Sequence, residues 1–177
     1  MIIKAIEEEF PWTKPVDRGD SVHVSDIIHD MDKELTGTSE RVITDDVRMQ
    51  FQKGYLWEVV LSRAFAEKSV SRPESIMVDG IKLSPDGLAV EGEQLVIEEY
   101  KCTSMSPDKS PADQWRWMMQ SKAYCYGFGI NLCVFRVLHL MFVPVYRPWR
   151  IRFTDAELAE NWQEILNHKR AMEVHGE

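Results

Sequence analysis

The order of apolar and polar positions along this chain of 177 residues predicts alternating helices and strands. Apolar residues at helical spacing, bounded by capping residues and glycines, predict helices over 26–35, 44–66, 110–126 and 155–170. Shorter apolar runs between turn residues predict strands over 75–83 (with a break at Asp79-Gly80), 86–90, 95–101, 131–138 and 140–146. Residues 1–20, which contain two prolines, are expected to form an irregular arm. This order of elements favours an α/β layer fold with a mixed sheet.

Residues 86–101 have the pattern of a β-hairpin, because two apolar runs flank a polar break that contains a glycine. If residues 91–94 form the loop, the register of the hairpin pairs Asp86 with Glu99. Directly opposed residues on one face of an antiparallel pair have Cβ atoms about 4.5–5.5 Å apart. Lys101 lies two residues beyond Glu99, so strand periodicity places its side chain on the same face. The hairpin is therefore expected to bring two carboxylates and one ammonium group together.

Opposed carboxylates repel each other unless a cation lies between them, so this arrangement indicates a divalent-metal site. The alternative is that Pro85-Asp86-Gly87 is an ordinary turn and that Glu99 ends a solvated strand. Glu98 is a rival ligand, but its side chain should point to the opposite face of the sheet.

These residues resemble a known signature. Pro85-Asp86, the spacing Glu99-x-Lys101 and the hairpin that joins them are similar to the motif of the PD-(D/E)XK nuclease superfamily. Two further motifs lie on the flanking predicted helices: Gly54-x-x-x-Glu58 and Gln120-x-x-x-Tyr124. Together the motifs resemble RecB-like exonucleases, including CRISPR-associated and phage members, over roughly residues 44–130.

The resemblance implies one nuclease domain over residues 1–177, with the motif-bearing core at 44–130 and a C-terminal helix at 154–172. It implies a restriction-endonuclease-like α/β core, in which helices flank a mixed central β-sheet. It also implies a Mg²⁺-dependent DNA nuclease, with Mn²⁺ as a substitute, that acts as an exonuclease rather than an endonuclease. The expected role is in recombination, repair or phage DNA processing.

The metal ligands and the catalytic residues follow from the hairpin. Asp86 and Glu99 supply hard oxygen ligands suited to Mg²⁺ or Mn²⁺. The resemblance adds the backbone carbonyl of Tyr100 as a third ligand. Lys101 is expected to position or activate the attacking water, or to stabilise developing negative charge.

Glu58 is the fourth candidate in the metal site. In enzymes that the chain resembles, the matching glutamate completes the site directly or through water. Glu58 shares a partly apolar helix face with Phe51 and Tyr55, where a carboxylate needs a partner. The alternative is a surface acid whose stem packs on that face.

Four residues of the predicted helix 110–126 are candidates for contacting nucleic acid. Gln120 and Tyr124 share one face, and the resemblance places that face near the scissile phosphate. Arg116 and Lys122 are candidate phosphate contacts, and only Arg116 shares the face. The alternative is that Tyr124 packs in the core and Gln120 caps a loop.

The distribution of charge supports a nucleic-acid partner more than the net charge of −8 does. Residues 101–152 carry 8 basic and 2 acidic side chains, a net charge of +6. Such a stretch can form a phosphate-contacting surface. Alternatively, strands scatter these charges to both faces of the sheet.

The cysteine count and the hydropathy pattern limit the class of protein. Cys102, Cys125 and Cys133 make an odd number without CxxC spacing, so we expect reduced thiols and no iron–sulfur cluster. No signal-peptide pattern occurs, and the apolar stretch 137–145 is too short to span a bilayer. These features favour a soluble protein of the cytoplasm, or of the host cytoplasm if it is phage-encoded.

Three classes of function remain open at this point. The first is the DNA nuclease, with DNA as substrate, a helicase or single-strand annealing protein as a candidate partner, and no membrane partner. The second is a catalytically silent nucleic-acid-binding module. The third is a structural subunit of a larger assembly. Homo-oligomer formation is compatible with each of them.

Overall fold

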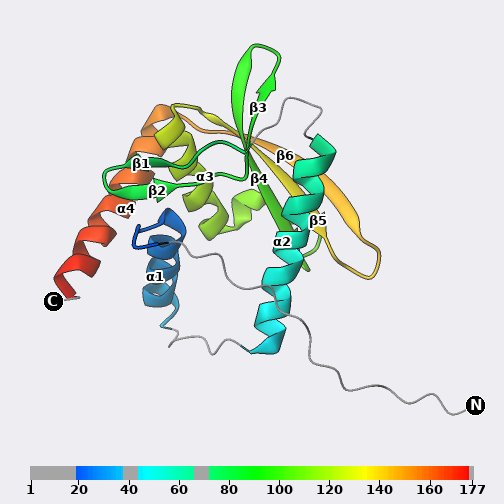
Figure 1. Cartoon of the computed structure of the whole chain (residues 1–177), viewed down its shortest axis with the longest axis horizontal. Coiled ribbons are helices and arrows are strands. Elements are labelled where there is room, and N and C mark those ends of the chain that lie inside the picture. The colour runs from blue at the N-terminus through cyan, green and yellow to red at the C-terminus, as the bar shows by residue number, and fades with distance from the viewer. Residues whose placement is uncertain (1–18, 38–43, 66–71, 176–177) are drawn as a thin grey trace, which may run out of the picture.

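The computed structural model describes residues 19–37, 44–65 and 72–175, which form four α-helices and six strands (Figure 1). The helices are α1 (Val24–Thr36), α2 (Asp45–Phe65), α3 (Trp115–Phe128) and α4 (Asp155–His175). The strands are β1 (Ile76–Val78), β2 (Ile81–Leu83), β3 (Gly87–Glu91), β4 (Gln94–Thr103), β5 (Leu132–His139) and β6 (Val145–Arg152). Most of the arm expected at 1–20 lies outside the described residues.

The main sheet has the strand order β3-β4-β5-β6 and is mixed, as predicted. β4 and β5 pair in parallel, whereas the β3–β4 and β5–β6 pairs are antiparallel. Parallel strands need a long crossover connection, and here that connection contains α3. α3 therefore lies against the strands that it joins, which places its side chains next to β4.

The main hydrophobic core lies on one face of the sheet. Ile97, Phe135 and Val137 pack there with buried residues of α1, α3 and α4. α2 lies on the other side, where the rings of Trp57 and Tyr146 meet with centroids 6.2 Å apart. Figure 1 shows α1, α3 and α4 to the left of α2, and the β5–β6 end of the sheet extends past α2 on its right. Among the helices that the described residues form, none has the length and apolarity needed to cross a membrane.

The strand predicted over 75–83 is a separate two-stranded hairpin, β1–β2. Asp79 and Gly80 form its turn with positive φ angles of 49° and 72°. Two successive residues with positive φ reverse the chain as a tight hairpin turn. The indole nitrogen of Trp162 donates to Asp79 at 2.9 Å and fixes this turn against α4.

The prediction of a strand over 140–146 was wrong, because the strand is β6 and begins at Val145. β6 alternates half-buried and exposed residues, and its basic side chains obscure that period in the sequence. The helix predicted from residue 110 is also divided: a 3₁₀ turn, Pro111–Asp113, precedes α3. The Ser110 capping box closes this turn rather than the long helix. α1 begins at Val24, two residues before the predicted start at residue 26, and its N-cap is His23.

Gly127 of α3 permits close packing of the β1–β2 hairpin. A Cβ atom at this position would overlap Cδ1 of buried Leu83 and would lie 3.4 Å from Cγ2 of Val78. At Gly54 of α2, no heavy atom lies within 4 Å of an added Cβ. Alanine at either position gains helix propensity, so the difference between the two variants isolates the packing cost.

We predict that Gly127→Ala unfolds more easily than Gly54→Ala, by about 1–3 kcal/mol in free energy of unfolding, because the overlap must be relieved inside a packed core. Urea unfolding followed by circular dichroism measures both variants against the unsubstituted protein. Equal stability of the two variants would contradict this packing.

Candidate metal and nuclease site

The β3–β4 hairpin has the predicted register. Gly87 pairs with Glu98, so Asp86, one residue earlier, stands opposite Glu99. One oxygen of Asp86 accepts a hydrogen bond from the backbone N–H of Tyr100 at 2.7 Å. The Asp86 side chain is thereby fixed against β4 at the point where the two strands diverge.

Lys101 extends from β4 on the same face as Glu99. Its ammonium nitrogen lies 2.6 Å from Oε1 of Glu99 and 3.1 Å from Oε1 of Gln120 on α3. The amide nitrogen of Gln120 in turn donates to the hydroxyl of Tyr124 at 2.9 Å. The structure thus connects two of the motifs through one chain of hydrogen bonds.

Glu58 reaches this cluster from α2. Its side chain is 22% exposed and accepts a hydrogen bond at 2.5 Å from Arg72, a residue between α2 and β1. Burial, followed by the negative charge of Asp86, raises the pKa of Glu58. The charge of Glu58 also contributes to a raised pKa at Glu99. These mutual effects on pKa place Glu58, Asp86 and Glu99 near one another, although their oxygen atoms do not all lie within 4.8 Å of one another. We call these three residues, from α2, the segment before β3 and β4, the carboxylate cluster.

Without a cation among its oxygens, the carboxylate cluster is electrostatically unfavourable. Burial, the charge of Asp86 and the charge of Glu58 raise the pKa of Glu99 to about 8, although Lys101 opposes the shift. Burial also raises the pKa of Asp86 despite the nearby Lys101. Burying charge is costly unless each group is paired and hydrogen-bonded. A divalent cation among these oxygens would supply the missing positive charge.

One oxygen of Glu99 shows that the donor set fits a cation. Oε1 is bonded to Lys101, whereas Oε2 is buried and has no hydrogen-bond partner in the described structure. A buried carboxylate oxygen without a partner is expected to have a ligand that complements it. The residues that could hold a metal here are Asp86 and Glu99, with Glu58 beside them.

Glu98 points to the opposite face of β4, as predicted. It is fully buried and forms an ion pair with Arg136 of β5. It also accepts a hydrogen bond at 3.0 Å from the hydroxyl of Tyr100. This network lies behind the carboxylate cluster and does not contribute a ligand to it.

Arg116 and Lys122 are not brought to the cluster. Arg116 forms an ion pair with Asp32 of α1 at 3.2 Å. Lys122 lies over the ring of Phe153, in a small depression that glutamates of α4 also line. The other basic side chains of residues 101–152 divide among separate partners, including Glu98, Asp108 and Glu91.

The contacts of two residues at the site were not predicted from the sequence. Arg72 stands in a polar segment before the first strand, and no motif identifies it. The ring of Trp117 packs against Phe135, and the ammonium of Lys101 lies 5.9 Å from the Trp117 ring centroid. The Trp117 contacts depend on how α3 packs on the sheet, and the Arg72–Glu58 contact joins α2 to the segment before β1.

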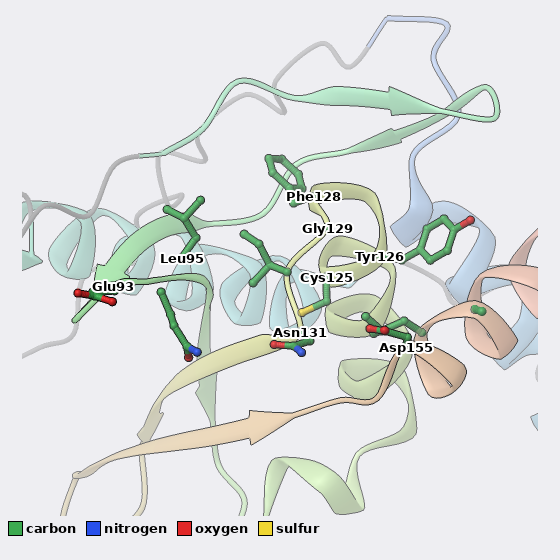
Figure 2. A pocket seen from close by; sticks show the side chains of 12 residues that line it. Glu93, Leu95, Cys125, Tyr126, Phe128, Gly129, Asn131 and Asp155 are labelled. Carbon is green, nitrogen blue, oxygen red and sulfur yellow. The ribbon is translucent and has the colours of Figure 1, made fainter.

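Two other features lie away from the carboxylate cluster. A pocket of about 690 Å³ opens between the β3–β4 turn, the end of α3 and the start of α4, as Figure 2 shows. Asp30, Glu34 and His168 bring their ligand atoms within 4.8 Å of one another between α1 and α4. A 3.1 Å contact between His168 and Asp30 accounts for that grouping without a metal.

No protein-family model and no curated protein matches the sequence. Among solved structures, the chain is similar to an alkaline exonuclease (LHK-Exo) from Laribacter hongkongensis, with 21% identity and a TM-score of 0.58 over 88% of this chain and 89% of that chain. A structure of LHK-Exo in complex with dAMP gives 22% identity and a TM-score of 0.56 over the same shares of the two chains. SSO0001 matches with 14% identity and a TM-score of 0.52 over 86% of this chain and 78% of that one. These similarities show that the chain has the predicted restriction-endonuclease-like fold.

The raised pKa of Glu99 predicts how stability depends on pH without metal. The unfolded carboxyl ionises near pH 4.5, whereas the folded one keeps its proton to about pH 8. Between these values the folded state binds the extra proton, so a rise in pH favours unfolding, by up to about 1.4 kcal/mol per pH unit. Glu99→Gln cannot ionise and is expected to show a shallower loss of stability between pH 5 and 8. Urea unfolding in EDTA measures both slopes, and equal slopes would show that folded Glu99 has an ordinary pKa.

Proposed function

We propose that this protein is a metal-dependent nuclease that hydrolyses phosphodiester bonds in DNA, as an exonuclease. The observation that carries the proposal is the cluster of Glu58, Asp86 and Glu99 beside Lys101, with one buried oxygen of Glu99 left unpaired. The fold supports it, because the similar solved structures include an alkaline exonuclease and its complex with dAMP.

The donor set favours Mg²⁺, with Mn²⁺ as a substitute, because both prefer carboxylate and carbonyl oxygens. Asp86, Glu99 and the backbone carbonyl of Tyr100 would hold the cation, and Glu58 would complete the site directly or through water. When bound there, a divalent cation polarises water and neutralises charge on the phosphate.

Lys101 acts as a fixed positive charge in this proposal. Burial alone would lower its pKa, but the charges of Glu99 and Asp86 outweigh burial and raise the pKa of Lys101. The side chain therefore stays protonated at neutral pH, which favours stabilisation of developing negative charge over proton abstraction. Its contacts with Glu99 and Gln120 hold the ammonium group in one position.

Gln120 and Tyr124 have a positioning role in this proposal, since Gln120 contacts Lys101 and Tyr124 is 4% exposed. The biological setting proposed from the resemblance is DNA recombination, repair or phage DNA processing in the cytoplasm. A helicase or a single-strand annealing protein is a candidate partner in that setting.

We predict that the protein degrades end-labelled linear DNA with Mg²⁺ or Mn²⁺, that EDTA abolishes the activity, and that covalently closed circular DNA survives. Lys101→Ala is expected to reduce the rate by about 100-fold or more, because it removes a preorganised charge. Gel assays on both substrates make the measurement. Cleavage of circles would indicate an endonuclease with the same chemistry, and binding without any cleavage would indicate a silent binding module.

Gln120→Ala is expected to lower kcat by about 10- to 100-fold while DNA affinity changes little, because the Lys101 ammonium loses a partner that orients it. Steady-state kinetics and fluorescence anisotropy separate the two quantities. Gln163→Ala is a matched control, because Gln163 is exposed on α4 and bonds to Asn167. A loss confined to DNA affinity would show that Gln120 contacts the nucleic acid instead.

A further inference from the structure

Arg72 is a cation on the solvent side of the carboxylate cluster. Its Nη1 atom lies 2.5 Å from Oε1 of Glu58. Its side chain is 61% exposed, whereas that of Glu58 is 22% exposed. The guanidinium group therefore contacts the cluster at one end and remains open to solvent.

The charge of Arg72 acts beyond its direct partner. It lowers the pKa of Asp86 as well as that of Glu58, against the larger effect of burial on both. Lys101 also acts on Asp86, but it is 17% exposed and is held by Glu99 and Gln120. Of these two cations, Arg72 is the one that an approaching polymer can reach.

A phosphodiester that enters this site meets three carboxylates, so it needs positive charge on its path. A guanidinium group offers a planar fork of N–H donors that matches two phosphate oxygens. A single contact with a carboxylate does not use all of these donors. The Glu58 carboxylate that holds Arg72 is also the one proposed to complete the metal site. A divalent cation at Glu58 competes with Arg72 for the same negative charge.

We propose that Arg72 binds a backbone phosphate of the DNA, and that a divalent cation at Glu58 releases Arg72 from its ion pair to do so. This inference rests on the proposed nuclease function and adds a phosphate-binding residue to it. Metal and DNA then bind cooperatively through Arg72. The simpler alternative is that Arg72 only neutralises Glu58 when no metal is bound.

The test compares DNA affinity with and without a cation. Anisotropy of a labelled partial duplex, which offers single- and double-stranded regions, is measured in EDTA and in Ca²⁺ with the DNA checked for integrity. Arg72→Ala is expected to weaken affinity about 10- to 100-fold in Ca²⁺, as for the loss of charge-assisted hydrogen bonds, and about 2-fold or less in EDTA. Arg72→Lys should recover part of the loss, because it keeps the charge without the fork.

Further measurements make the result specific to Arg72. Arg150→Ala removes an arginine that is 65% exposed and paired with Glu91, and it should show no Ca²⁺-dependent loss. Calorimetric titration with Ca²⁺ should show that Arg72→Ala binds the cation as tightly as the unsubstituted protein, or more tightly. Arg72→Gln repeats each measurement with a side chain closer in length, and thermal unfolding verifies that the variants fold.

Each outcome decides whether Arg72 binds phosphate in the presence of the cation or only neutralises Glu58. An equal loss of DNA affinity in EDTA and Ca²⁺, or no loss, while the unsubstituted protein still degrades DNA, overturns the inference and leaves the nuclease proposal standing. Weaker Ca²⁺ binding by Arg72→Ala would place Arg72 in support of the metal site and also overturns it. If the unsubstituted protein neither binds nor cleaves DNA, the proposed function fails and the inference fails with it.

Discussion

The register of the β3–β4 hairpin, which places Asp86 opposite Glu99, is the constraint on which the site depends. This register puts two acids on the face that also carries Lys101, and it turns Glu98 to the other face. β3 pairs with β4 as far as Glu98, and β5 pairs with β4 from Ile97 to Thr103, so backbone pairing holds β4 on both sides up to Glu98 and on the β5 side beyond it. The sheet therefore holds together charges that would separate if the backbone were free.

The face behind the site stabilises that register. Glu98 is fully buried and pairs with Arg136, whose Nε lies 2.8 Å from it, and the Tyr100 hydroxyl adds a further hydrogen bond. A slip of one residue would exchange the faces of Glu98 and Glu99. A slip that moved Ile97 into the position of Glu98 would leave Arg136 without its carboxylate, and an uncompensated buried charge costs about 3–5 kcal/mol. The ion pair behind the sheet thus opposes the slip that would remove Glu99 from the site.

The sequence was sufficient for the parts of this arrangement that are local. The glycine-containing break and the two apolar runs predicted the hairpin register, and strand periodicity separated Glu98 from Glu99. Helix periodicity predicted that Gln120 and Tyr124 share a face, and a hydrogen bond joins them. The position of β6 was missed because Arg147 lies on its half-buried face, where the sequence pattern calls for an apolar residue. Arg72 and the partner of Lys122 could not be predicted, because they depend on how separate elements pack.

The cost of the carboxylate cluster explains why Glu99, which is fully buried, lies on an inner strand of the sheet rather than in a loop. Glu99 is 2% exposed, and the buried core residues Ile97 and Phe135 lie beside it on β4 and β5. A less rigid segment would relieve the repulsion by moving the acids apart or into water, and the site would lose its geometry. Here the surrounding core supplies the stability that the buried, mutually repelling carboxylates reduce, as is common at functional sites. A cation that binds the cluster only in the folded protein would stabilise the fold by mass action. Metal binding and folding are therefore coupled through Glu99.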